Sequence, residues 1–214
     1  DETGFKFGLR AEIADSIVTA RLYPLNPRIA FRDWTVNESN YVAYDMNNNL
    51  FKASMTVNSA GKSLIKLYTD RDGLFHNGIN AELAGIELRD WLVLSPFAPP
   101  IDGTLSGNAK INFNEQYYWG DCCIRVDRMS YGKKLVGNLD FDAKLAMTDD
   151  ATKTYALADM ELDGKEIMTL RGMKNDSLPT SEYNLDIAIK RLPLSRVSAF
   201  LPDGTGDMSG YLNG

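Results

Sequence analysis

The stretch NLDFDAKLAM, residues Asn138 to Met147, alternates apolar and polar side chains over most of its length. Successive side chains of a β-strand point to opposite faces of the sheet. On this spacing one face carries Leu139, Phe141, Ala143, Leu145 and Met147. The stretch therefore predicts a strand with one apolar side and one side that faces water.

The same period of two recurs along the chain, in residues 51–57, 105–113, 122–126 and 185–189. A parallel sheet covered on both faces would show continuous apolar runs instead. Turn-forming residues separate these segments, at 47–49, 59–61, 71–73, 163–164 and 175–177. We therefore expect an all-β fold of ten or more strands in a mostly antiparallel meander.

Two short stretches are typical of helices. The first runs from Leu88 to Leu94, and the second from Pro193 to Phe200, where proline suits the first helical turn. Prolines follow both stretches and stop each helix from continuing.

The two helical stretches lie in matching contexts about 104 residues apart, since the motifs start at Leu88 and Leu192. Each follows an alternating strand and precedes an Asp-Gly-Thr turn, at Asp102 and Asp203. We interpret this as two repeat units. Residues 1–107 form the first and end in a short helix and a glycine turn, and residues 108–214 form the second, cut short at its end. Such repetition favours an elongated sheet that grows by addition.

Composition limits the possible partners. The chain of 214 residues has 23 Lys and Arg against 29 Asp and Glu, a net charge of -6. This balance, without a basic stripe, disfavours nucleic-acid binding and electrostatic attachment to an anionic membrane. No window approaches the roughly 18 apolar residues of a membrane span. Because the chain begins at Asp1 and ends in a strand-like segment, we expect a fragment of a longer protein.

The sequence shows no catalytic centre. Its one histidine, His76, lies in a loop-like segment, and no serine sits in a Gly-x-Ser-x-Gly elbow. Cys122 and Cys123 are adjacent, so a disulfide between them would be strained, and we interpret them as unpaired residues. Asp140 and Asp142 are interpreted as solvated carboxylates on the outer face of their strand. We therefore expect no enzyme activity, no cofactor and no metal.

Two segments carry a resemblance to a known family. The segment Leu192 to Gly214 has the form Leu-Pro-Leu-x-x-Val-x-x-Phe-Leu-Pro followed by glycine-spaced residues and Leu-Asn-Gly. It resembles the C-terminal region of the TamB/AsmA-like (DUF490) family. The arch from Pro27 to Val42 is similar to the Bacteroidetes members of that family. The resemblance covers residues 17–57 and 80–214.

This resemblance implies a curved, taco-like sheet with an apolar concave face. It also implies a periplasmic part of an inner-membrane-anchored protein in Gram-negative bacteria, which works with an Omp85-class outer-membrane β-barrel. The implied roles are phospholipid passage between membranes and assembly of outer-membrane proteins. The family has no catalytic residues that could be transferred to this chain.

The residue pattern supports a lipid groove on separate grounds. A one-sided apolar sheet must bury that side, and two short helices are too small to cover it. A sheet that curls without closing leaves a trough, in which each buried methylene of an acyl chain contributes about 0.8 kcal/mol. The predicted lining comprises Phe51, Met55, Ile111, Phe113, Leu139, Phe141, Leu145, Met147, Ile187 and Ile189.

Other interpretations of the pattern stay open. Small inward residues such as Ala53 and Ala143 would equally pack a narrow, filled sandwich core. A secreted β-sandwich that binds carbohydrate or protein would account for the acidity and for aromatic residues such as Trp34, Trp91 and Trp119. Open strand edges would also allow the isolated chain to dimerise.

Overall fold

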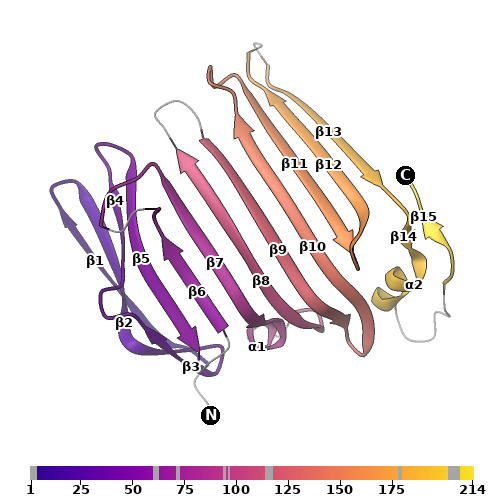
Figure 1. Ribbon diagram of the computed structural model, residues 1–214, viewed down its shortest axis with the longest axis horizontal. Helices are drawn as coiled ribbons and strands as arrows, with labels where there is room; N and C mark the ends of the chain where they lie inside the picture. Colours follow the sequence, from indigo (N-terminus) through magenta and orange to yellow (C-terminus); the bar gives the residue numbers. More distant parts are fainter. Residues whose placement is uncertain are drawn as a thin grey trace. The chain divides into compact units, whose positions relative to one another are not determined.

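The fold is mostly antiparallel β-sheet with two short α-helices, in agreement with the predicted all-β class (Figure 1). The computed structural model describes residues 4–59, 63–70, 73–93, 95, 97–113, 118–177, 180–201 and 208–214. These divide into two compact units, Asp1–Ile86 with Ser106–Gly120, and Glu87–Leu105 with Asp121–Gly214. None of the helices within the described ranges has both the length and the apolarity to cross a bilayer.

The first unit is built from antiparallel strands in the hydrogen-bonded order β1-β2-β3-β5-β6-β7, with β4 pairing to β2 and β5. Their bounds are β1 Lys6–Ala14, β2 Ile17–Ile29, β3 Arg32–Val36, β4 Tyr41–Asp45, β5 Leu50–Ser59, β6 Ser63–Tyr68 and β7 Gly78–Glu87. Strands β8 (Ile101–Phe113) and β9 (Tyr118–Tyr131) each have residues in both units.

The core of the first unit lies on one face of these strands. The register sets Val36 opposite Val57, and Val57 opposite Ile65, so their side chains share a face. Trp34, only 2% exposed, donates from Nε1 to the Ile29 carbonyl at 2.9 Å. Burying the ring with its polar atom satisfied ties β3 to the end of β2.

The second unit is an antiparallel sheet in the order β10-β11-β12-β13, accompanied by short elements. The strands are β10 Lys134–Met147, β11 Lys153–Leu162, β12 Lys165–Asn175 and β13 Glu182–Ile189. The helices are α1 Leu88–Leu92 and α2 Leu194–Val197, and a 3-10 turn, η1, covers Ser198–Phe200. Two-residue strands β14 (Leu192–Pro193) and β15 (Tyr211–Leu212) pair with each other.

The turn predictions at 47–49 and 163–164 are confirmed, whereas Asn175 of the predicted turn at 175–177 is the last residue of β12. Asp163 and Gly164 have φ of 51° and 73°, the left-handed pair that closes a two-residue hairpin, and they join β11 to β12. Residues 47–49 form the turn after β4, where the Asp45 carboxylate accepts from the Asn47 amide at 2.9 Å. The predicted turns at 59–61 and 71–73 include residues outside the described ranges.

The helix predictions need two corrections. Helix α1 begins at Leu88 as expected but ends at Leu92, before the predicted end at Leu94, which lies outside the described residues. Helix α2 begins at Leu194 rather than at Pro193. Pro193 keeps an extended backbone because it pairs with Tyr211 between β14 and β15. The two repeat units, residues 1–107 and 108–214, stay a prediction.

Candidate functional site: an apolar sheet face

The second unit carries a continuous apolar face across four strands. Antiparallel partners point to the same side of a sheet, and Phe141 pairs with Met160, Met160 with Met168, and Met168 with Ile189. We call this the β10–β13 apolar face. It consists of Leu139, Phe141, Ala143, Leu145, Met147, Ala156, Ala158, Met160, Leu162, Met168, Leu170, Gly172, Leu185, Ile187 and Ile189.

The opposite face of the same strands carries most of their charged side chains. Asp142 pairs with Asp159, Leu157 pairs with Arg171, and Arg171 pairs with Asp186. Two carboxylates on this face contact side chains of β9, since Asp140 lies 3.7 Å from Arg125 and Asp142 hydrogen-bonds Cys123. On β10 to β13 the period of two therefore places most charged side chains on this face, together with Leu157 and Met173.

Six of the predicted groove residues lie together on the β10–β13 apolar face, namely Leu139, Phe141, Leu145, Met147, Ile187 and Ile189. The face is largely open to solvent away from α2. Leu145 is 39% exposed, Ile187 52% and Leu185 62%. Large apolar side chains left this exposed are typical of surfaces that bind something apolar.

The middle of the face is lined by small residues. Ala143 pairs with Ala158, and Ala156 pairs with Gly172. A Cβ added to Gly172 would lie 3.5 Å from the Ala156 Cβ, which is ordinary van der Waals contact. The surface is therefore lower here than beside the flanking leucine and methionine side chains.

One end of the face is covered by α2 and η1. Val136, Leu162, Ile167 and Ala199 form a buried cluster there, with Leu139, Met160 and Leu192 packed against it. Ile167 joins this cluster because the pairing of β11 with β12 shifts after Met160, where Glu161 pairs with Glu166. The extra residue on β12 turns Ile167 toward the covered side.

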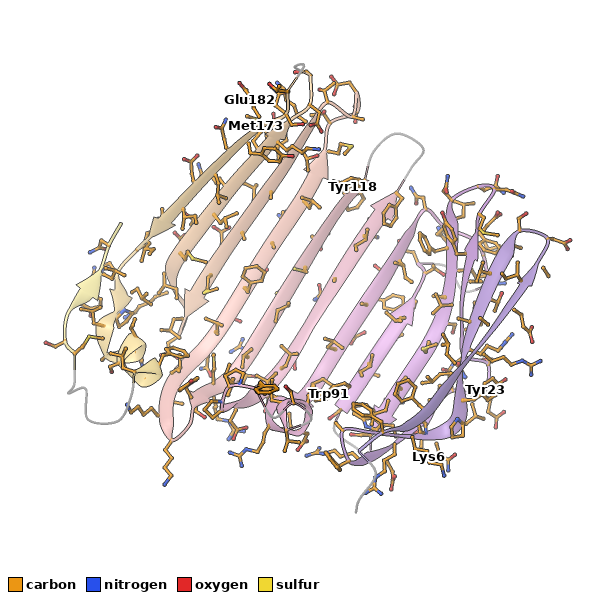
Figure 2. The ribbon with its side chains drawn as sticks, turned by 180° about the vertical axis from the view of Figure 1, so that it is seen from behind. Lys6, Tyr23, Trp91, Tyr118, Met173 and Glu182 are labelled. Atoms are coloured by element: carbon orange, nitrogen blue, oxygen red, sulfur yellow. The ribbon has the colours of Figure 1, made fainter. Side chains whose placement is uncertain are left out.

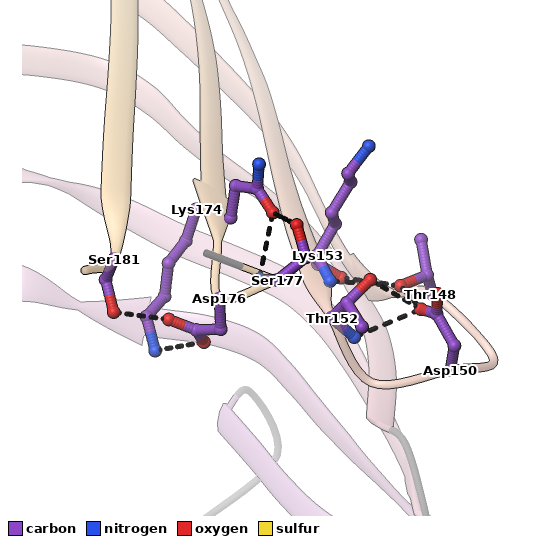
Figure 3. A network of polar contacts seen from close by, with 9 residues as sticks. Thr148, Asp150, Thr152, Lys153, Lys174, Asp176, Ser177 and Ser181 are labelled. Atoms are coloured by element: carbon purple, nitrogen blue, oxygen red, sulfur yellow. Dashed lines mark hydrogen bonds and ion pairs between the residues drawn. The ribbon is translucent and has the colours of Figure 1, made fainter. Parts of the chain in front are cut away.

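Polar turns follow the strands at the other end of the face (Figure 3). Asp150 accepts from the Thr148 and Thr152 hydroxyls at 2.6 and 2.7 Å and from the Thr152 amide. Led by the bond from Thr148, these contacts lower the pKa of Asp150 to about 2. In the next turn, Lys174 lies 2.6 Å from Asp176 and lowers the pKa of that carboxyl.

Lys174 marks the boundary between the apolar and polar zones, because it pairs with Thr154 and Tyr183 on the apolar side. Figure 2 shows Met173 and Glu182 close to the same turn, between β12 and β13.

Measured along β10 from Leu139 to Met147, eight residue steps of about 3.4 Å give an apolar strip of roughly 27 Å.

The remaining predicted groove residues belong to the first unit. Phe51 and Met55 lie on one face of β5, where they pair with Tyr44 and Leu67. The ring of Phe113 lies 5.6 Å from that of Phe51, and Ile111 on β8 is 45% exposed. The structure thus describes two groups of predicted lining residues, one in each unit.

The cysteine and histidine side chains, which are of types that take part in catalysis or metal binding, lie outside the apolar face at Cys122, Cys123 and His76. Cys122 and Cys123 are free thiols, and the hydrogen bond to Asp142, with burial, raises the pKa of Cys123. His76 is engaged through its backbone, which bridges to Phe51 with two bonds of 2.6 Å. Within the described residues, no three His, Cys, Asp or Glu side chains are grouped to hold a metal ion.

Several side chains at the covered end were not singled out from the sequence. They are Met129, Val136, Met160, Leu162 and Ile167. A signal existed for β11, because Ala156, Ala158, Met160 and Leu162 alternate with polar residues over part of that strand. The small residues at its start weaken that pattern. For Ile167, which depends on a pairing shift, the sequence held no such signal.

Comparisons with family models, with curated proteins and with solved structures found no match to this chain.

Proposed function

We propose that this chain is a non-catalytic segment of a periplasmic bridge between the inner and outer membranes. In this proposal it offers an apolar trough to phospholipid acyl chains, to strands of outer-membrane proteins during assembly, or to both. The full-length protein would be anchored in the inner membrane and would meet an Omp85-class β-barrel. The family resemblance of Leu192 to Gly214 supplies the location and the barrel partner.

The observation that carries the proposal is the exposed β10–β13 apolar face. Its strip of roughly 27 Å exceeds the length of one acyl layer, about half of the 30 Å hydrocarbon core of a bilayer. Covering exposed Leu145, Leu185 and Ile187 with methylenes is favourable by about 0.8 kcal/mol per buried methylene, before the cost of association.

The edge strand β13 supports the protein-assembly branch. It ends the hydrogen-bonded order of its sheet, and the described contacts on its outer side are those between Ile189 and Gly214, at 2.7 and 3.0 Å. An extended segment of a client protein could add to the rest of this edge through main-chain hydrogen bonds.

A secreted β-sandwich that binds carbohydrate is the alternative function. It relies on exposed aromatic rings, and Trp119 is 42% exposed. Trp34, one of the aromatic residues considered for sugar stacking, is instead buried in the core of the first unit. The structure therefore gives this alternative less support than the apolar trough.

Site-specific photocrosslinking tests the proposal. A photoreactive amino acid replaces Phe141 on the apolar face, and in a matched control it replaces Lys144 on the opposite face of the same strand. The protein is incubated with phosphatidylethanolamine and phosphatidylglycerol vesicles and then irradiated. We expect lipid adducts by mass spectrometry from position 141 and not from position 144. Equal adducts from both positions, or none from 141, would contradict lipid binding.

A further inference from the structure

A distinct pocket lies beneath α2, at the covered end of the β10–β13 apolar face. We call it the α2 pocket, and its volume is about 230 Å³. Strands β9 to β12 form its floor and α2 with η1 forms its roof. Its lining residues are Met129, Val136, Leu139, Met160, Leu162, Ile167, Leu192, Arg196, Val197 and Phe200.

The pocket offers no charge to a ligand, although Arg196 lies in its wall. The Arg196 guanidinium donates from Nη1 to the Leu135 carbonyl at 3.3 Å, and its Nη2 lies 3.2 Å from Asp163. Asp163 also accepts from the Asn138 amide at 2.8 Å. Because these bonds direct the charge toward the strand turns, the surface left for a ligand is apolar, and a polar group bound there would lose its hydrogen bonds.

The roof is held in place by contacts with residues at the ends of β9 and β10. The ring of Phe200 lies 5.0 Å from that of Tyr131, and Ala199 is buried against the sheet. Lys134 donates from Nζ to the carbonyls of Ser198 and Leu201, each at 3.4 Å. The cavity is thus formed before any ligand arrives, and this reduces the ordering cost of binding.

The volume limits the size of the ligand. An apolar protein cavity of about 150 Å³ holds benzene, with six carbons, so 230 Å³ scales to about nine carbons. Leu139 and Met160 belong both to the pocket and to the open face, so a longer chain can continue onto that face without a polar barrier.

We infer that the α2 pocket binds the methyl end of a single aliphatic chain, with about nine carbons inside and the rest along the β10–β13 apolar face. This inference rests on the proposed function and adds an orientation to it. The methyl end of the lipid lies under α2, and the polar end of the lipid points toward the turns that hold Asp150 and Asp176. The described geometry gives the headgroup no specific contact.

A series of alkanoates from about six to about fourteen carbons, each kept below its micelle concentration, tests the inference. Binding is followed by NMR of ¹³C-methyl methionine, with Met129 and Met160 as reporters in the pocket and Met173 as a reporter on the opposite face. We expect affinity to rise about fourfold per carbon up to about nine carbons and by less than about twofold per carbon beyond. Shifts should appear at Met129 and Met160 but not at Met173.

Two substitutions on the roof make the test specific. Val197→Trp fills the pocket and should abolish the shifts at Met129 and Met160, whereas Leu157→Trp on the opposite face of the sheet should leave them. Val197→Ala enlarges the cavity and should move the change of slope to a longer chain. Circular dichroism checks that each variant keeps its strands.

An unchanged series in Val197→Trp would overturn the inference, as would a uniform slope with no change near nine carbons. Either result, together with lipid adducts from position 141, would leave the proposed function in place and remove only the pocket. Loss of those adducts as well would remove both.

Discussion

Two leucine-to-alanine substitutions on the same sheet face should differ greatly in their effect on stability. Leu162 and Leu185 both belong to the β10–β13 apolar face, but Leu162 is 5% exposed under α2 and Leu185 is 62% exposed. Each substitution removes three carbons, which are worth roughly 2.4 kcal/mol when fully buried.

For Leu162→Ala almost all of this value is lost, and the cavity left beside the α2 pocket adds to it, so the loss should be about 3 kcal/mol. For Leu185→Ala the buried share is little more than a third and no cavity forms, so the loss should be about 0.9 kcal/mol. Urea denaturation followed by circular dichroism measures both changes in the free energy of unfolding. Losses of similar size would mean that the apolar face is covered along its whole length in solution, and would refute the open trough.

Three further predictions concern polar groups. The pKa of Asp150 is lowered to about 2 from 3.8, so its carboxylate stabilises the fold above pH 3.8. This contribution is lost as the pH falls toward 2. Asp150→Ala should therefore lower the melting temperature at pH 7 and make the melting temperature fall less steeply in acid. An unchanged acid profile would count against this network. The hydrogen bond with Asp142 raises the pKa of Cys123, so Asp142→Asn should speed the reaction of that thiol with maleimide at pH 8. The rate is measured in a Cys122→Ser background, so that only one thiol reacts. An equal rate with and without Asp142→Asn would refute the contact. Buried Asn40 exchanges hydrogen bonds with the backbone of Leu22, so Asn40→Ala should cost about 2 kcal/mol in urea denaturation, and a loss below about 0.5 kcal/mol would show that these bonds are dispensable.

Much of the fold was predictable from the sequence because a strand with one buried face shows alternating apolar and polar residues. Residues 138–147 alternate, and the structure gives them one apolar and one polar side in β10. The turn at Asp163 and Gly164 was equally predictable, since glycine tolerates the left-handed backbone and aspartate adopts it more readily than most residues. Helix α2 was placed one residue early because the pairing of Pro193 with Tyr211 joins segments 18 residues apart.

The candidate site was predictable only in part. Six of the ten predicted lining residues share the β10–β13 apolar face, because the face of a side chain follows from its position in the strand. The α2 pocket was not predictable. It requires Val197 and Ile167, thirty residues apart, to line the same cavity, and it requires the pairing shift after Met160.

In segments that alternate clearly, such as residues 138–147, the sequence alone predicts a strand and the side of the strand on which each apolar residue lies, because both depend on neighbours one or two positions away. Which part of that apolar side is covered depends on the tertiary fold. Leu162 and Leu185 have the same chemistry and the same face, yet one is buried and the other exposed. That difference arises because α2 packs over one end of the face alone, through contacts between residues far apart in the chain.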